Sequence, residues 1–300
     1  MKSNKIRGII YLLLTATIWG GSFISQFFGG KILGAFSFTG FRCLFGCFAI
    51  FIMIIIDNFF EYKRFMFFKP TEDVPLTIKN SLWCGVALFF GMATQQIGVQ
   101  LTDTAKAGLI ASLEAVVVPL MLLILYKRKI KLVTWLFIIT SMIGIMLLSS
   151  NSVGGLNFGD VLVFISTILY SITILQVSKY ATNLEPLTFS FFRFVAVGIL
   201  GVTFAFIFNE NPFNLQNLVD AAPSMLYSGI LASGVAYTFQ ILGQRDCEPI
   251  IATLLMSLEG IFAAIFGWII LNQSLNSIQI FGILIAFVSI VLVQITDNKT

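Results

Sequence analysis

The feature that most constrains this chain is the length of its segments without charged residues. No Asp, Glu, Lys or Arg occurs in residues 8–30, 80–102, 132–159, 221–244 and 260–296. A helix of about 20 residues crosses the hydrocarbon core of a bilayer, which is about 30 Å thick. Charged residues form 11% of the whole chain, less than half of the roughly 25% that soluble domains carry on their surfaces. The sequence therefore predicts an all-α integral membrane protein.

Turn residues divide the longer apolar stretches into separate runs joined by short connections. Ten transmembrane helices are predicted, at residues 8–28, 36–56, 81–101, 104–126, 132–150, 158–178, 187–208, 223–243, 249–271 and 277–296. The basic residues before the first run resemble the start of a signal peptide. That run is longer than a signal core and lacks an A-x-A cleavage site, so we expect an uncleaved first helix.

The basic residues indicate the orientation. With the N-terminus in the cytoplasm, the clusters Lys2–Arg7, Lys63–Lys79 and Lys127–Lys131 all fall on the cytoplasmic side, and only Lys31 and Lys106 lie outside. Cytoplasmic loops of membrane proteins carry an excess of Lys and Arg. The sequence therefore predicts a multi-pass protein of the cell (inner or plasma) membrane, with an even number of spans and both termini cytoplasmic.

The two halves of the chain share short sequence matches. Phe38–Arg42 (FTGFR) matches Phe189–Arg193 (FSFFR), Ser112–Glu114 matches Ser257–Glu259 (both SLE), and Gly91–Ala93 matches Gly234–Ala236. Each match lies on corresponding helices of residues 8–150 and 158–296. Five spans per half is an odd number, so the second half enters the membrane from the opposite side. Such inverted five-helix repeats are characteristic of transporters that face alternately inward and outward.

Three motifs connect the chain with a known family. They are Trp19–Phe23 (WGGSF), Gln100–Gly108 (QLTDTAKAG), and Ser257–Glu259 followed by Gly267–Leu271 (GWIIL). With them, the chain resembles the EamA-type members of the drug/metabolite transporter superfamily over about residues 9–149 and 158–295. The resemblance implies a ten-helix carrier of small solutes, built from two EamA-like repeats, with cytoplasmic termini. Two departures concern gating detail: Ala115 and Gly260 replace a frequent Pro after the SLE glutamate, and Asn272 replaces an acidic residue.

Four charged residues fall well inside the predicted spans: Arg42, Arg193, Glu114 and Glu259. An intramembrane charge costs at least ~2.5–3.5 kcal/mol on insertion scales, so each should face protein or a water-filled cavity and have a partner. Helix rise places both glutamates near the midplane and the arginines toward opposite faces. Two interpretations stay open. Arg42–Glu114 and Arg193–Glu259 are ion pairs that hold helices together, or the glutamates line a central cavity and bind a cationic solute or a proton.

Uncharged side chains at membrane depth are further candidates for solute or proton binding. Gln95 and Gln96 lie on the third predicted helix, and Tyr237 and Gln240 lie on the eighth. Trp19, deep in the first span, is a candidate lining residue. Polar groups at this depth also bond between helices, so these residues can equally be packing contacts.

These observations predict a secondary transporter of small metabolites that works by alternating access and exports amino-acid-like or related solutes. The sequence has no GxxxxGK[ST] loop, which argues against direct use of ATP by this chain. An alternative is uptake or facilitated diffusion of a nucleotide, sugar or cofactor-like solute. More remote alternatives are a non-transporting membrane scaffold and an intramembrane enzyme. An enzyme is disfavoured because the chain has no His, the most frequent catalytic base.

We expect no catalytic residues, no metal site and no cofactor. Histidine is absent and the four cysteines are scattered without a CxxC pair, so the usual thiolate and imidazole ligand sets are missing. The expected partners are a small solute and the lipid bilayer, and no nucleic acid. Proton coupling and homo-oligomer formation stay open.

Overall fold

The structure is a computed structural model, and it describes residues 2–102, 104–127, 131–148, 157–181, 184–271 and 276–297. All regular elements in these ranges are helices. Seven helical segments there are long and apolar enough to cross a membrane by length and composition. Three shorter apolar segments, Glu114–Tyr126, Trp135–Gly144 and Ile280–Ser289, accompany them. The expected all-helical membrane protein is thus confirmed, whereas ten separate spans stay a prediction.

Three long helices open the fold: α1 (Lys2–Leu33), α2 (Ala35–Tyr62) and α3 (Val74–Leu101). Gly34 alone separates α1 from α2, and its φ of 92° is a backbone conformation that glycine adopts without strain. The start of α3 is defined by Asp73, whose side chain accepts a hydrogen bond from the Leu76 N–H at 3.1 Å. This is the usual N-cap role of Asp.

The next long helices are α7 (Phe158–Tyr180) and α8 (Pro186–Ile207), followed by α9 (Leu215–Leu226), the π-helical stretch η1 (Tyr227–Ala236) and α10 (Tyr237–Asp246). The last three form one unbroken helical segment, 215–246. Asn157 and Asp160 form a capping box at the start of α7. Asp160 also accepts a hydrogen bond from Thr102 at 2.6 Å, which connects this helix to the end of α3.

Two of the predicted spans are broken in the middle. Residues 104–126 form α4 (Thr104–Ala111) and α5 (Glu114–Tyr126), and residues 249–271 form α11 (Pro249–Met256) and α12 (Glu259–Leu271). At each break, a backbone N–H donates to the carbonyl three residues earlier instead of four, which tightens the helix locally. The Leu113 N–H donates to the Ile110 carbonyl at 3.1 Å, and the Leu258 N–H to the Leu255 carbonyl at 3.3 Å. Both predicted spans are therefore interrupted at their SLE motifs, although the segment Pro249–Ile270 as a whole is long and apolar enough to cross a membrane.

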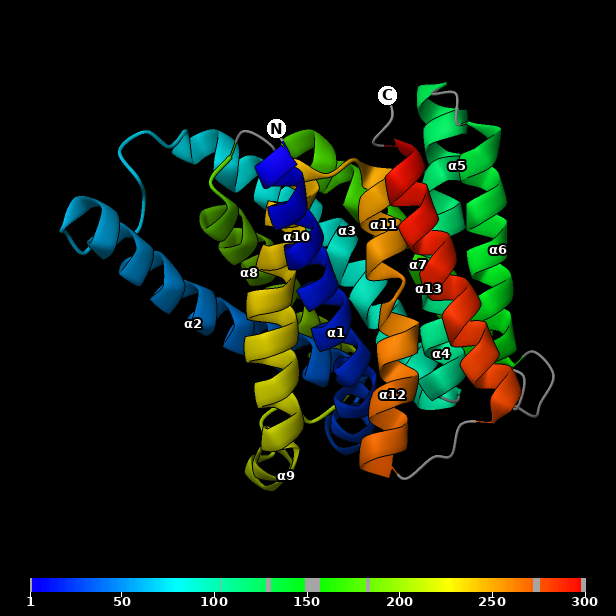
Figure 1. The fold of residues 1–300 in the computed structure, drawn as a ribbon. Helices are drawn as coiled ribbons and strands as arrows, with labels where there is room; N and C mark the ends of the chain where they lie inside the picture. The colour runs from blue at the N-terminus through cyan, green and yellow to red at the C-terminus, as the bar shows by residue number, and fades with distance from the viewer. Residues whose placement is uncertain are drawn as a thin grey trace.

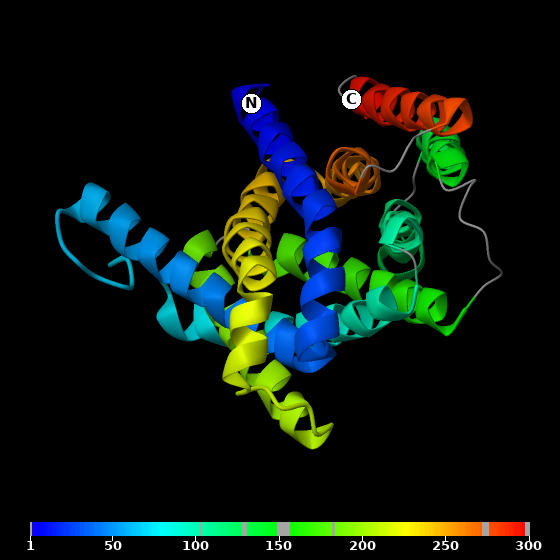
Figure 2. The same ribbon diagram turned by 90° about the horizontal axis from the view of Figure 1, so that it is seen from below.

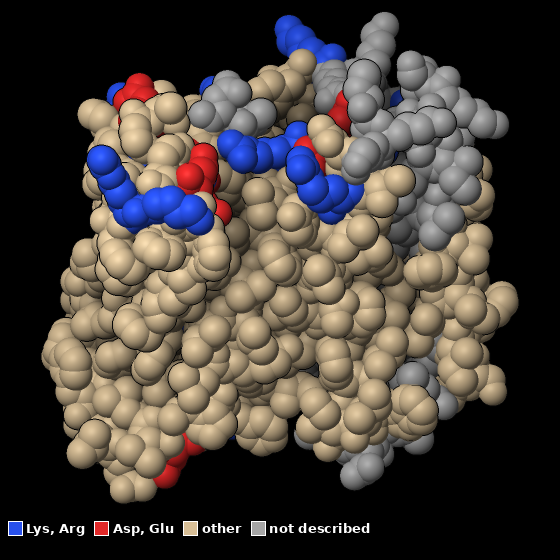
Figure 3. Space-filling model, turned by 60° about the vertical axis from the view of Figure 1, so that its left-hand side comes forward, with Lys and Arg blue, Asp and Glu red and all other residues tan. Residues whose placement is uncertain are grey.

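The helices pack as a bundle with one peripheral pair. Figures 1 and 2 show α6 (Leu132–Leu148) and α13 (Ser277–Asp297) side by side at one edge. Elsewhere α2 lies along α8, α3 along α7 and α8, and α1 along α10 and α12. The start of α1 and the end of α13 lie at the same end of the bundle (Figure 1). On the face shown in Figure 3, Lys and Arg gather toward that end, and the band below them is uncharged outside the grey atoms.

Two carboxylates connect the halves at opposite ends of the bundle. At the start of α2, Glu210 accepts hydrogen bonds from the Ser37 N–H and hydroxyl, both at 2.7 Å, and from the Phe36 N–H at 3.2 Å. At the start of α8, the Thr188 hydroxyl donates to Glu72 at 3.3 Å. We call these the Glu210 contact and the Glu72 contact. Each contact joins the N-terminal turn of one helix to the loop that follows the other.

Lys69 adds charge pairing beside the Glu72 contact. Its Nζ lies 2.9 Å from Asp57, 2.8 Å from Glu61 and 3.6 Å from Glu185. Burial raises the pKa of Glu72, whose Oε1 has no hydrogen-bond partner. The end of α2 and the start of α8 are therefore held together by this loop.

Candidate functional site

The two helix breaks meet at the centre of the molecule. The Ser112 hydroxyl donates to the carbonyl of Ser257 at 3.1 Å and to the carbonyl of Gly108 at 2.9 Å. A Cβ built on Gly260 would lie 2.9 Å from Ser112 Oγ, so a larger residue there would displace the Ser112 hydroxyl. Glu114 and Glu259 are each the first residue of the second half-helix, so both follow this contact closely in the chain.

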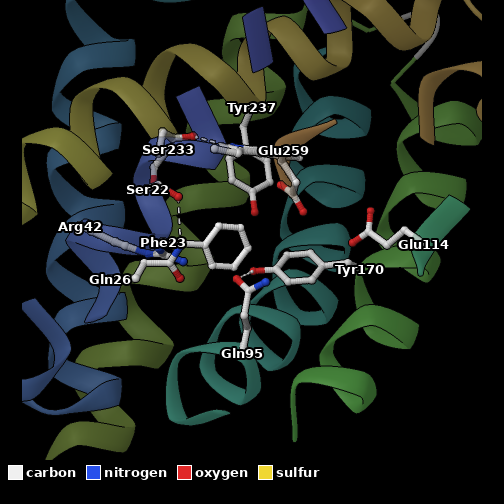
Figure 4. Close-up of a pocket in the computed structure, with 12 residues that line it drawn as sticks. Ser22, Phe23, Gln26, Arg42, Gln95, Glu114, Tyr170, Ser233, Tyr237 and Glu259 are labelled. Carbon is white, nitrogen blue, oxygen red and sulfur yellow. Dashed lines mark hydrogen bonds between the residues drawn. The ribbon is translucent and has the colours of Figure 1, made fainter. Parts of the chain in front are cut away.

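A cavity lies beside this crossing (Figure 4). Its volume open to water is about 30 Å³, which suffices for roughly two or three water molecules. Its walls come from α1, α2, α3, α5, α7, η1, α10 and α12. The lining residues are Trp19, Ser22, Phe23, Gln26, Arg42, Gln95, Glu114, Tyr170, Ala232, Ser233, Tyr237 and Glu259. In this conformation the cavity is narrow, and its wall is part polar and part apolar.

Three charged side chains face this cavity from different helices. Arg42 is 3% exposed, Glu259 is 8% exposed and Glu114 is partly buried. Arg42 enters from α2, whereas the two glutamates enter from the side of α5 and α12 (Figure 4). Among the described residues, no salt bridge joins either arginine to either glutamate. The predicted ion pairs Arg42–Glu114 and Arg193–Glu259 are therefore not formed.

Aromatic and amide groups form the rest of the wall. The Trp19 Nε1–H donates to the carbonyl of Ala232 at 3.1 Å, and its ring centroid lies 4.7 Å from that of Tyr237. The Tyr170 hydroxyl donates to Gln95 Oε1 at 3.2 Å. Indole and phenol groups combine an apolar face with one polar atom, so they can contact both parts of an amphipathic solute.

Six of the nine residues predicted from the sequence line the cavity, and three do not. Arg193 is fully buried outside it, with its guanidinium carbon 5.4 Å from the centre of the Tyr237 ring. Gln96 donates to the carbonyl of Gln26 at 2.9 Å, which is a helix–helix contact. Gln240 is 2% exposed and is not a lining residue. The positions of Gln96 and Gln240 therefore fit contacts between helices better than contact with a solute.

Sequence reasoning missed six lining residues: Ser22, Phe23, Gln26, Tyr170, Ala232 and Ser233. Two of these, Ser22 and Phe23, belong to the WGGSF motif, which pointed to the family and not to individual side chains. Tyr170 stands 151 residues after Trp19, the same offset that relates Arg193 to Arg42. The repeat was therefore the signal that could have identified Tyr170.

Comparison with known proteins decides the family. The sequence model of the EamA-like transporter family matches residues 6–150 and 157–295. The chain belongs to the EamA-like transporter family. Two proteins of Archaeoglobus fulgidus named as uncharacterized transporters are similar to it. One is 26% identical over 95% of this chain and 84% of its own length, and the other is 25% identical over 97% and 98%.

A solved crystal structure has the same fold as this EamA-like chain. The two superpose with a TM-score of 0.75 at 14% identity, over 100% of this chain and 99% of that one. The family and its transporter relatives establish that the chain is a membrane transporter and not an enzyme. The cavity is therefore a candidate solute site. Within the described residues, no group of three His, Cys, Asp or Glu could hold a metal ion.

Proposed function

We propose that this EamA-like transporter is a secondary carrier that exports amino-acid-like or related small metabolites by alternating access. The observation that carries the proposal is the crossing of two broken helices at a buried cavity lined by charged residues. Transporters of this kind bind solute near the membrane midplane, between helices interrupted at the site. A short stretch of three-residue spacing within a helix often marks a functional hinge.

We further propose that the two halves, residues 8–150 and 158–296, are inverted repeats. The packing pattern supports this. If α1 corresponds to α7, α2 to α8 and α3 to the segment 215–246, the contact of α3 with α7 has its equivalent in the contact of α10 with α1. Likewise, the contact of α4 with α12 matches that of α11 with α5. The pairs α2–α8 and α6–α13 join equivalent helices, as elements next to a two-fold axis must.

Two close helix crossings repeat in the same way. A Cβ on Gly98 of α3 would lie 2.9 Å from the carbonyl oxygen of Gly159 on α7. A Cβ on Gly243 of α10 would lie 3.1 Å from the carbonyl oxygen of Gly8 on α1. These glycines are related by the offsets of the sequence repeat, 145 and 151 residues. At both crossings the two backbones lie too close for a side chain to fit between them. The two crossings are therefore equivalent in their packing.

The proposal includes ten membrane spans in the cell membrane with both termini cytoplasmic. The broken helices count as one span each, and the pairs α4–α5 and α11–α12 are then equivalent. The position of Lys and Arg at the end that holds both termini (Figures 1 and 3) supports this orientation, because basic residues accumulate on the cytoplasmic side.

Reconstitution into liposomes tests the proposed function. Purified protein is incorporated in one orientation, and the flux of labelled amino acids, nucleotides, sugars and a cofactor-like solute is measured in both directions, with and without a pH gradient. We expect saturable flux of an amino-acid-like solute from the cytoplasmic side to the other side. Flux of a nucleotide, sugar or cofactor-like solute, or net uptake, would favour the alternative carrier. No flux of any solute would favour a non-transporting scaffold.

A further inference from the structure

A second cavity lies between the start of α3 and the ends of α5 and α7, and its volume open to water is about 130 Å³. Its lining includes Trp83 of α3, Tyr126 of α5, and Gln176, Lys179 and Tyr180 of α7. It shares no lining residue with the cavity at the helix crossing. The end of α5 lies at the same end of the bundle as the start of α1 (Figure 1). We call this space the interface cavity, because its residues lie where the predicted spans begin or end.

The surroundings of the interface cavity are those of a membrane surface. Trp83 is 63% exposed and Tyr126 is 54% exposed. Trp and Tyr are enriched at the boundary between membrane and water, where their rings lie at the level of the lipid headgroups. Leu125 and Ile172, in the same lining, are exposed apolar side chains of spanning helices, and lipid tails are as apolar as these side chains. The interface cavity therefore adjoins lipid as well as water.

Lysines from all three helices lie at or beside the interface cavity. Lys179 is an exposed lining residue, and its Nζ lies 5.0 Å from the centre of the Tyr180 ring. Lys127 directly follows α5, and Lys79 lies one helical turn before Trp83 on the same face of α3. Within the described part of the chain, no salt bridge includes any of these lysines. Basic pockets between transmembrane helices on the cytoplasmic side bind the headgroups of anionic lipids.

Gln176 provides an unused hydrogen-bond acceptor in the same wall. Its Oε1 is buried and has no hydrogen-bond partner among the described residues. Gln176 and Lys179 are three residues apart on α7, so they lie on one face of the helix. An unpaired buried acceptor costs free energy, and a donor from a ligand would recover that cost. The wall therefore matches a headgroup that combines a negative charge with a hydroxyl donor.

We propose that the interface cavity binds an anionic phospholipid with a hydroxylated headgroup, of the phosphatidylglycerol type. The phosphate contacts Lys179, and a headgroup hydroxyl donates to Gln176 Oε1. The acyl chains lie over Leu125 and Ile172. The lipid thereby connects the ends of α5 and α7, two helices that also line the cavity at the helix crossing. Its position in the cytoplasmic leaflet rests on the proposed orientation, whereas the binding itself is measured without transport.

Three lipids with identical acyl chains test the proposal. Phosphatidylglycerol has the negative charge and the hydroxyls, phosphatidylmethanol has the charge without the hydroxyls, and phosphatidylcholine has neither a net charge nor a hydroxyl. Each lipid is titrated into the purified protein in detergent, and bound lipid is counted by native mass spectrometry. We expect phosphatidylglycerol to bind about tenfold more tightly than phosphatidylcholine, with phosphatidylmethanol intermediate. Phosphatidylcholine bound as tightly as phosphatidylglycerol would overturn the inference.

Two variants test the individual contacts. Lys179→Gln should weaken binding of phosphatidylglycerol about fivefold. Gln176→Leu should weaken it about threefold and leave binding of phosphatidylmethanol unchanged. Lys63→Gln is the matched control, because Lys63 is also exposed and its Nζ lies over an aromatic ring, 5.7 Å from the centre of Phe60, outside the interface cavity. Unchanged binding in Lys179→Gln, or an equal loss in Lys63→Gln, would overturn the site.

A soluble competitor separates a lipid site from a site for free phosphate. Glycerol phosphate carries the phosphate and the hydroxyls but no acyl chains. At equal concentration it should leave phosphatidylglycerol bound, because the apolar contacts with Leu125 and Ile172 stabilise only the acylated molecule. Complete displacement would overturn the lipid assignment. Failure of this inference is distinguishable from failure of the proposed function, since flux without lipid preference removes the lipid site and leaves the carrier.

Discussion

Glu259 is a buried carboxyl at the start of a half-helix, and it has no salt bridge within the described part of the chain. The sequence predicts that it lies near the midplane, because depth can be estimated from helix rise. The sequence could not decide whether Glu259 pairs with Arg193 or lines a cavity, because the answer depends on the direction of the Arg193 side chain. The stacking of Arg193 on Tyr237 is a tertiary contact without a local sequence signal.

Glu259→Gln should leave the protein folded and abolish coupling to a proton gradient. The amide preserves the volume and breaks no ion pair, so the melting temperature should change by no more than about 2 °C. Loss of the titratable charge should reduce gradient-driven flux by about tenfold or more. Thermal unfolding and pH-driven flux are measured on the same preparation. The double variant Arg193→Gln, Glu259→Gln is the control, and recovery of a stability lost in the single variant would contradict this expectation.

Glu72 is a carboxyl outside the membrane-spanning helices whose pKa is raised, mainly by burial. A carboxyl with a raised pKa in the folded state is destabilising when charged, so its contribution to stability declines as the pH rises from about 4.5 through the folded-state pKa. Glu72→Gln should therefore raise the melting temperature at pH 8, by about 1–3 °C, and leave it unchanged at pH 4. The neighbouring charge of Glu185 adds to the effect. Equal shifts at both pH values would show that charge is not the cause.

The helix breaks are the elements that sequence analysis did not predict. Neither SLE motif is followed by proline, since Ala115 and Gly260 occupy those positions, and proline is the residue that interrupts a helix by local chemistry alone. Pro119 lies inside α5, beyond the break at Ser112 and Leu113, so no proline marks the position of either break in the sequence. The interruption of residues 104–126 and 249–271 accompanies the contact of Ser112 with Ser257, residues 145 positions apart in the chain. The other helices were predicted well because apolar length determines them locally.

The Glu210 and Glu72 contacts are expected to open alternately during transport, because each closes one end of the bundle between α2 and α8. Two double-cysteine variants test this: Ser37→Cys with Glu210→Cys, and Glu72→Cys with Thr188→Cys. A short bifunctional methanethiosulfonate should block flux in both by about tenfold or more, and reduction should restore it. The wild-type protein is the control, since its four cysteines are buried. Full transport by either cross-linked variant would contradict the prediction.

At the scale of the whole molecule, the division into related halves was predicted from three short matches in the sequence. Ser112 and Ser257, which one of those matches pairs in the sequence, contact each other at the SLE crossing. The composition of the cavity could be predicted only in part. Tyr170 and Gln26 are ordinary residues in their own helices, and only the packing of α1 against α3 and of α3 against α7 brings them to the same space.

The position of the basic residues predicts which face of the molecule lies in the cytoplasm. Phe65→Cys, in the loop after α2, should be cytoplasmic, and Asn211→Cys, between α8 and α9, should be external; both sites are exposed. In intact cells, a membrane-impermeant maleimide should label Asn211→Cys and should label Phe65→Cys only after permeabilisation. Neither substitution changes a charge, so the bias of Lys and Arg that sets the orientation is preserved. The reverse labelling pattern would place both termini outside and reverse the direction proposed for export.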